Sequence, residues 1–233
     1  MTRLLRILST VLITAGLVVL ADVGITLAWK EPVSSIYASV QQHKAENQLA
    51  DLERSFPGPA LLRRIQKVHG IRDKVADLAR AFSHEVDRGQ SIGRIQIPAI
   101  DLDAVIVQGT DTASLEKGPG HYPNTPFPGQ GGTVAIAGHR TTYLAPFRHL
   151  DSLQAGDEVM VEMPYANFTY RLERPPTRIV DPGDVGIIHK VGYERLVMTA
   201  CNPLYSAAQR IAGFARLQDV SFFAASGRPW QDP

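Results

Sequence analysis

The chain's only cysteine lies in the stretch Leu196-Val197-Met198-Thr199-Ala200-Cys201-Asn202-Pro203. This apolar run predicts a buried strand that ends at the thiol, because the Asn-Pro pair that follows interrupts strands. A second apolar run begins at Gln209-Arg210-Ile211. If the two runs are antiparallel neighbours joined by residues 202–208, Cys201 and Arg210 flank the same loop. The two runs therefore predict a β-hairpin with a thiol and a guanidinium at one end.

Short β-prone runs fill the chain from Ile92 onward, and turns rich in Pro, Gly and Asp separate them. The expected strands are Ile92–Ile97, Leu102–Val107, Thr133–Ala137, Glu158–Met163, Phe168–Leu172, Arg178–Val180, Leu196–Cys201 and Ile211–Val220. Because no helical pattern alternates with them, about eight short strands predict an all-β barrel or sandwich. We expect this domain to cover residues 91–225, with a loosely ordered tail over 226–233.

An apolar segment spans Ile7–Trp29, with Asp22 as its only charge. Roughly 20 apolar residues are enough to cross a bilayer. Arg3 and Arg6 precede the segment, and positive residues favour the cytoplasmic side. Residues 1–32 are therefore expected to form a cytoplasmic tip and a transmembrane anchor, with the rest of the chain extracellular. A cleaved signal peptide is the alternative, but its apolar core is usually shorter and ends at a small-x-small site.

Residues 33–90 are polar and helix-prone, so we expect a helical stalk or linker. Apolar residues recur there at steps of three and four, which predicts one amphipathic helix face. They are Leu61, Ile65, Val68, Ile71, Val75, Leu78, Phe82 and Val86. The segment either holds the domain away from the membrane or acts as a lid, or it packs on the domain or dimerises.

Composition excludes several classes of function. The net charge is +1 and the pI is about 7.9, so nothing indicates nucleic-acid binding. The sequence has no HExxH or CxxC metal motif, no GxGxxG or Walker motif, and no G-x-S-x-G serine elbow, so we expect no metal and no cofactor. A lone cysteine outside the membrane is an intermolecular link, a free reactive thiol or a buried structural residue. Its position at a strand end favours the reactive thiol.

A cysteine acyl-transfer enzyme also needs a proton carrier and a group that stabilises the oxyanion. An imidazole suits proton transfer near neutral pH. His139 follows the apolar run Thr133–Gly138, but spacing alone does not select it from the seven histidines. Arg210 is either an oxyanion-binding or substrate-binding group or an ordinary surface salt-bridge residue.

Two segments and a shorter motif resemble sortases, the membrane-anchored cysteine transpeptidases of mainly Gram-positive bacteria. Leu196–Cys201 together with Asn202–Arg210 resembles their nucleophile segment, and Ala137-Gly138-His139-Arg140-Thr141-Thr142-Tyr143 resembles their histidine segment. Gly120-His121-Tyr122-Pro123 and Asn202-Pro203-x-Tyr205-Ser206 look most like class E, the actinobacterial housekeeping type. The resemblance runs from about Ile92 to Phe223.

This resemblance implies an eight-stranded sortase-type β-barrel. Cys201 would attack the Thr–Gly bond of a Leu-Ala-x-Thr-Gly-like sorting signal, His139 would transfer protons, and Arg210 would steady the acyl intermediate. An amine of a cell-wall precursor, lipid II-like, would then resolve the thioacyl enzyme. Substrate contacts are expected from Tyr122, Thr199, Ala200, Asn202 and Tyr205.

Ala200 departs from the resembled pattern, which has a threonine before the cysteine. That hydroxyl is missing, and Thr199 should point to the opposite strand face, so it is a poor substitute. Three alternatives stay open: a pilin-polymerising sortase whose acceptor is a pilin lysine, an inactive peptide-binding barrel, and an L,D-transpeptidase. The last would place a histidine beside the cysteine, where Thr199 and Ala200 stand.

Overall fold

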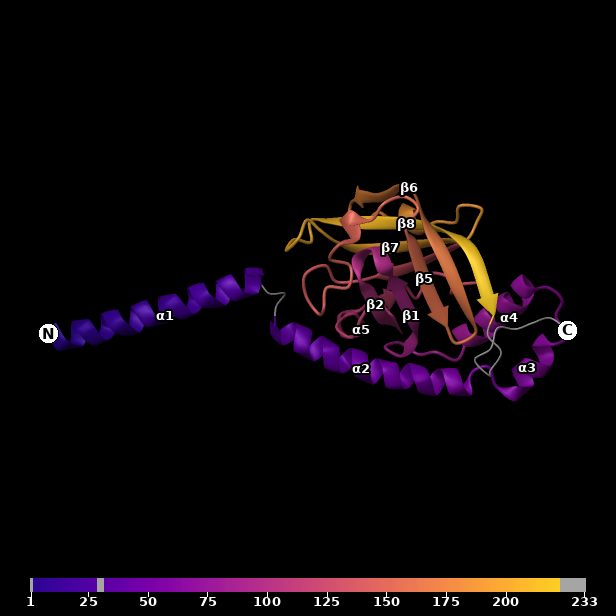
Figure 1. Cartoon of the computed structure of the whole chain (residues 1–233), viewed down its shortest axis with the longest axis horizontal. Helices are drawn as coiled ribbons and strands as arrows, with labels where there is room; N and C mark the ends of the chain where they lie inside the picture. The colour runs from indigo at the N-terminus through magenta and orange to yellow at the C-terminus, as the bar shows by residue number, and fades with distance from the viewer. Residues whose placement is uncertain (1, 29–31, 223–233) are drawn as a thin grey trace.

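The computed structural model describes residues 2–28 and 32–222. The end of the expected membrane span at Trp29 and the expected tail at 226–233 lie outside the described residues. Helix α1 (Thr2–Ala28) extends away from the rest of the molecule, and α2 (Pro32–Ser55) runs along the side of a β-barrel (Figure 1). Within α1, Arg3–Gly24 is long and apolar enough to cross a membrane, with a mean hydropathy of 2.3.

Eight strands of the described chain close into a barrel in the order β1-β2-β3-β4-β7-β8-β6-β5. Their bounds are β1 Ser91–Ile97, β2 Leu102–Gln108, β3 Gly120–His121, β4 Thr133–Ala137, β5 Glu158–Met163, β6 Ala166–Val180, β7 Arg195–Asn202 and β8 Gln209–Phe222. Pairing is antiparallel except for β2 with β3 and β4 with β7. The predicted eight-stranded barrel is confirmed. Short helices lie at Thr112–Leu115 (α5), Pro98–Ile100 (η1), Leu150–Ser152 (η2) and Val185–Ile188 (η3).

Two strand predictions differ from the structure. The runs Phe168–Leu172 and Arg178–Val180 belong to one strand, β6, whose pairing with β8 shifts register between Leu172 and Thr177. Pro175 and Pro176 lie at this irregularity, where a strand tolerates missing donors. The two-residue strand β3 was not expected, because Pro119-Gly120 indicates a turn.

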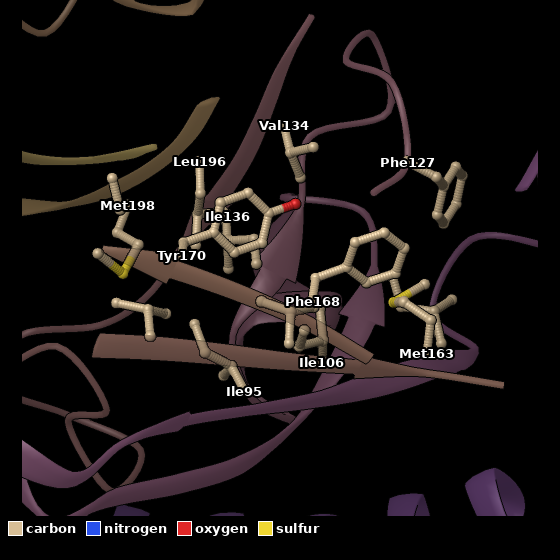
Figure 2. Packing of buried hydrophobic residues seen from close by; sticks show 14 of the residues in the cluster. Ile95, Ile106, Phe127, Val134, Ile136, Met163, Phe168, Tyr170, Leu196 and Met198 are labelled. Carbon is tan, nitrogen blue, oxygen red and sulfur yellow. The ribbon is translucent and has the colours of Figure 1, made fainter. Parts of the chain in front are cut away.

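Along each strand, successive side chains point alternately into the barrel interior and toward its outer surface. On β7, Leu196, Met198 and Ala200 belong to the interior cluster, whereas Val197 belongs to a separate cluster on the outer face. Figure 2 shows Leu196 and Met198 near Ile136 and Tyr170 inside the barrel. The strand that carries Cys201 is therefore fixed from within by apolar packing.

The segment expected to be a stalk packs on the domain, which was one of the possibilities that the sequence left open. Helix α4 (Ile71–Ser83) contributes Val75, Leu78 and Phe82 to the barrel's core cluster. The single amphipathic helix predicted over Leu61–Val86 is wrong, because α3 (Pro59–Ile65) and α4 are separate helices. Gly70 lies between them as the N-cap of α4, with a φ of 85° that residues carrying a Cβ atom rarely adopt.

Candidate active site

The β7–β8 hairpin brings Cys201 and Arg210 together. The two residues are direct partners in the antiparallel register of the two strands. Side chains of directly opposed residues project from the same face of a sheet. Cys201 is a partly exposed free thiol. The hairpin inferred from the sequence is therefore present, with both functional groups on one face at its end.

His139 reaches the same strand end from β4. Strand β4 runs parallel to β7 with Ala137 opposite Thr199, and the N–H of Gly138 donates to the carbonyl of Thr199 at 2.9 Å. A Cβ atom at Gly138 would lie 2.5 Å from the ring of Phe147, so only glycine fits here. The chain therefore enters the His139 loop immediately beside the end of β7.

The His139 ring is half-buried, and its Nε2 has no hydrogen-bond partner among the described residues. Burial lowers the pKa of His139, and the carboxylate of Glu116 opposes this shift. The Tyr143 ring lies beside the imidazole, with 5.0 Å between ring centroids. A half-buried imidazole whose pKa is lowered and which keeps one nitrogen free is suited to accept and return a proton.

Arg140 connects the histidine segment to the residue after the thiol. Its side chain is 4% exposed, and its Nη1 donates to Oδ1 of Asn202. Its other donors bind the Asp151 carboxylate at 2.8 Å and the Arg148 carbonyl at 3.3 Å. Asn202 in turn donates to the side chain of Gln209 at 3.2 Å. This arrangement ties together the His139 loop, the end of β7 and the start of β8.

The guanidinium of Arg210 is oriented by its own loop. Its Nη1 donates to the carbonyls of Ala207 and Gln209, both at 2.9 Å. A guanidinium carries five N–H donors, so these two bonds orient the group without exhausting it. Tyr205 projects from the same loop with 58% of its surface exposed, and the Arg148 guanidinium lies 6.0 Å from its ring centroid.

A second apolar cluster packs on the outer face of β4, β7 and β8, the face of β7 on which Cys201 lies. Its buried members are Ala135, Ile187, Val197, Ala212 and Phe214, with Tyr122, Val180 and Ile188 packed against them. Thr199 lies on this face, two residues before Cys201, and its hydroxyl shares a 2.9 Å hydrogen bond with the Tyr122 hydroxyl. Tyr122 and Thr199, both expected to contact substrate, are therefore brought together.

Ala200 occupies the other face of β7. Its methyl group lies in the interior cluster, 3% exposed, so the position projects into the barrel. Thr199 is opposite to Ala200, as the sequence indicated, and this orientation puts Thr199 on the face of Cys201. The hydroxyl that the resembled pattern has at position 200 would thus belong to the packed side of the strand.

The structure separates His139 from the other histidines. His121, which belongs to the same class E-like motif as Tyr122, is 1% exposed and contacts Gln108, Thr125 and the Pro126 carbonyl. Burial lowers the pKa of His121 to about 4, so it stays neutral and serves packing. The other five histidines are all exposed: His43, His69, His84, His149 and His189.

Three residues of this region were missed by sequence reasoning: Glu116, Arg140 and Tyr143. Arg140 and Tyr143 stand inside the quoted histidine segment, so their positions offered a signal. Glu116 offered none, because it lies far from that segment in the chain. Among the described residues, no three His, Cys, Asp or Glu side chains group to hold a metal ion.

Comparisons with known proteins agree with this geometry. The sequence model of the Sortase domain family matches residues 95–218. Sortase D of Bacillus subtilis (strain 168) is 35% identical over 141 residues, covering 59% of this chain and 68% of that protein.

Solved structures give the same result. Sortase E of Streptomyces avermitilis is 33% identical with a TM-score of 0.53, covering 62% of this chain and 93% of that one. A Clostridium perfringens Sortase D5 transpeptidase shares the fold, with a TM-score of 0.59 over 77% of this chain and 99% of that one, at 23% identity. The chain therefore belongs to the sortase family of cysteine transpeptidases.

Proposed function

We propose that Cys201 is the nucleophile of this sortase, that His139 carries the protons and that Arg210 stabilises the acyl-transfer intermediate. The observation that carries this proposal is the meeting of three strand ends. Cys201 and Arg210 are register partners, and the bond from Gly138 to Thr199 brings the His139 loop beside them. The substrate is a peptide sorting signal resembling Leu-Ala-x-Thr-Gly.

The reaction runs in two halves through a covalent intermediate. The sulfur of Cys201 attacks the threonine carbonyl carbon while His139 takes the thiol proton. The tetrahedral oxyanion is stabilised by the Arg210 guanidinium. The C–N bond then breaks, and His139 gives its proton to the leaving glycine amine, which leaves a thioester on Cys201. An incoming amine attacks this thioester, His139 accepts its proton, and the thiol is restored as the new amide forms.

The apolar outer face supports a peptide ligand with small and aliphatic side chains. Its members near Cys201 are small: Thr199 lies two positions before Cys201 and Ala212 lies opposite Thr199, while Ala135 lies opposite Val197. We assign the preference for alanine in the signal to Tyr122, whose ring packs on this surface and whose hydroxyl is held by Thr199. Asn202 and Tyr205 border the same site, with Asn202 acting mainly through its bond to Arg140.

The acceptor is an amine of a cell-wall precursor, and the domain acts outside the cell. One N-terminal apolar helix is long enough for a membrane anchor. Arg3 and Arg6 before its apolar stretch favour a cytoplasmic N-terminus. This orientation presents the barrel to exported proteins and to lipid-linked precursors at the outer membrane surface.

The test uses the full chain in detergent micelles, mixed with a Leu-Ala-x-Thr-Gly peptide and triglycine. Mass spectrometry follows a thioacyl adduct on Cys201 and the ligated product, with Cys201→Ala as the control. Adduct and product together support the proposal. A lysine-bearing pilin peptide as a second acceptor tests the pilin-polymerising alternative. Ligated product with the lysine peptide and none with triglycine would overturn the proposal of a cell-wall acceptor in favour of a pilin lysine. Absence of any adduct with peptides of this class overturns the proposed signal.

A further inference from the structure

The loop that follows His139 contains a left-handed turn of three residues that carry side chains. Tyr143, Leu144 and Ala145 have φ values of 49°, 64° and 46°. Non-glycine residues rarely adopt this region, and consecutive ones are rarer still, because Cβ crowds the backbone. Such a conformation persists only where the surroundings hold it in place. Contacts outside the turn therefore hold it in this conformation.

Tyr143 makes contacts on three sides. Its ring lies beside the His139 imidazole at 5.0 Å, and its hydroxyl donates to Oε1 of Glu116 at 3.1 Å. Its backbone N–H donates to Oγ of Ser34 on α2 at 3.3 Å. Its ring also meets the edge of Tyr37, again on α2, at 6.3 Å between centroids. The residue beside the imidazole is thus held from the juxtamembrane helix.

Helix α2 is itself fixed to the barrel. The side-chain nitrogen of Gln42 donates to the carbonyls of Val105 and Lys117 at 3.1 and 2.6 Å, and its oxygen accepts from the N–H of Val105 at 2.8 Å. Ala45 and Leu49 pack with Val105 in a small apolar cluster. The helix therefore follows the barrel wall (Figure 1) and holds both strand β2 and the segment beside Glu116.

We infer that Tyr143 is a positioning residue for His139 and that α2 holds Tyr143 in place, so the juxtamembrane helix is part of the active-site architecture. This inference rests on the proposed role of His139. The ring of Tyr143 restricts rotation of the imidazole, and the bond to Glu116 fixes the ring. An imidazole free to rotate would spend less time aligned for proton transfer, which lowers kcat and leaves peptide binding largely intact.

The test measures kcat and KM separately for the full chain, in variants that leave Cys201, His139 and Arg210 unchanged. Tyr143→Ala is expected to lower kcat about tenfold or more with less than a twofold change in KM. Tyr143→Phe keeps the ring and should recover most of that loss. The thermal midpoint and the rate of Cys201 alkylation by iodoacetamide verify that the barrel is intact.

The part played by α2 is tested with Tyr37→Ala, which removes the ring contact without altering the histidine loop. Its matched control is Ile36→Ala, the neighbouring residue on α2, which is 67% exposed. We expect a two- to fivefold lower kcat for Tyr37→Ala and no change for Ile36→Ala. Equal rates for the two variants would overturn the role of α2.

A folded Tyr143→Ala enzyme with kcat within twofold of the unmodified chain would overturn the positioning role. If Tyr143→Ala does not fold, the ratio between Tyr37→Ala and Ile36→Ala still decides the inference. Failure of the proposed function looks different, because the unmodified chain would then form neither adduct nor product.

Discussion

The two faces of strand β7 perform different tasks within one stretch of sequence. Leu196, Met198 and Ala200 project into the barrel and are buried in its main core cluster. Val197, Thr199 and Cys201 project outward, beside the surface to which we assign the signal peptide. The packed face gives the other face its rigidity, and a rigid strand positions a nucleophile more accurately than a loop does.

Removing the thiol is the largest expected change on the outer face. Cys201→Ala should reduce transpeptidation at least about 10³-fold, because the covalent intermediate depends on the sulfur. Stability should change little, since the side chain is partly exposed at a strand end. Product formation by mass spectrometry and the thermal midpoint measure the two effects. Residual transpeptidation close to the original rate would contradict the assignment of the nucleophile.

A truncation on the inner face should have the reverse effect. Met198 is fully buried in the core, so Met198→Ala leaves a cavity and is expected to cost about 2–5 kcal/mol of unfolding free energy. The outward neighbours keep their register, so kcat per folded molecule should change less than the stability does. Urea unfolding and active-site titration with a thiol reagent separate the two. Unchanged stability would show that the two faces are not divided as described.

The sequence predicted the hairpin and its pair of groups because both depend on local order. An apolar run, a breaker and a second run place Cys201 and Arg210 on either side of one loop wherever the hairpin forms, and the register of the structure makes them direct partners. The contacts that complete the site depend on long-range packing. Arg140 meets Asn202 across 62 positions, and Tyr143 meets Ser34 across 109. No local periodicity encodes such contacts, and this is also why the docking of α2 and α4 was left open.

Thr199 and Ala200 offer a comparison between adjacent positions on opposite faces. Thr199→Val removes the hydrogen bond to Tyr122, which should cost about 0.5–1.5 kcal/mol and raise KM for a Leu-Ala-x-Thr-Gly peptide severalfold. Ala200→Thr inserts a hydroxyl into the core and should cost about 1–3 kcal/mol without raising kcat.

Unfolding curves give the stability of both variants, and steady-state kinetics give their kcat and KM. A higher kcat for Ala200→Thr would mean that the side chain at position 200 acts on the face that carries Cys201, which would contradict the alternation of side chains along β7. An unchanged KM in Thr199→Val would separate the Tyr122–Thr199 pair from signal recognition.

The smallest expected effect is a shift in the pH dependence of kcat when the negative charge of Glu116 near His139 is removed. Burial lowers the pKa of His139 from its usual value near 6.5, and the Glu116 carboxylate partly restores it. Since the neutral imidazole accepts the thiol proton, the acid limb of kcat should lie below pH 6.5. Glu116→Gln removes the opposing charge, so the pKa falls further and the limb should move to lower pH by a few tenths of a unit.

Glu46→Gln serves as the matched control, because Glu46 is an exposed carboxylate on α2 that pairs with Arg94. It should leave the pH profile of kcat unchanged. An acid limb that moves to higher pH in Glu116→Gln, or moves equally in both variants, would exclude Glu116 as the local charge acting on His139. A shift confined to Glu116→Gln would show that a carboxylate outside β7, hydrogen-bonded to Tyr143, acts on the reacting imidazole.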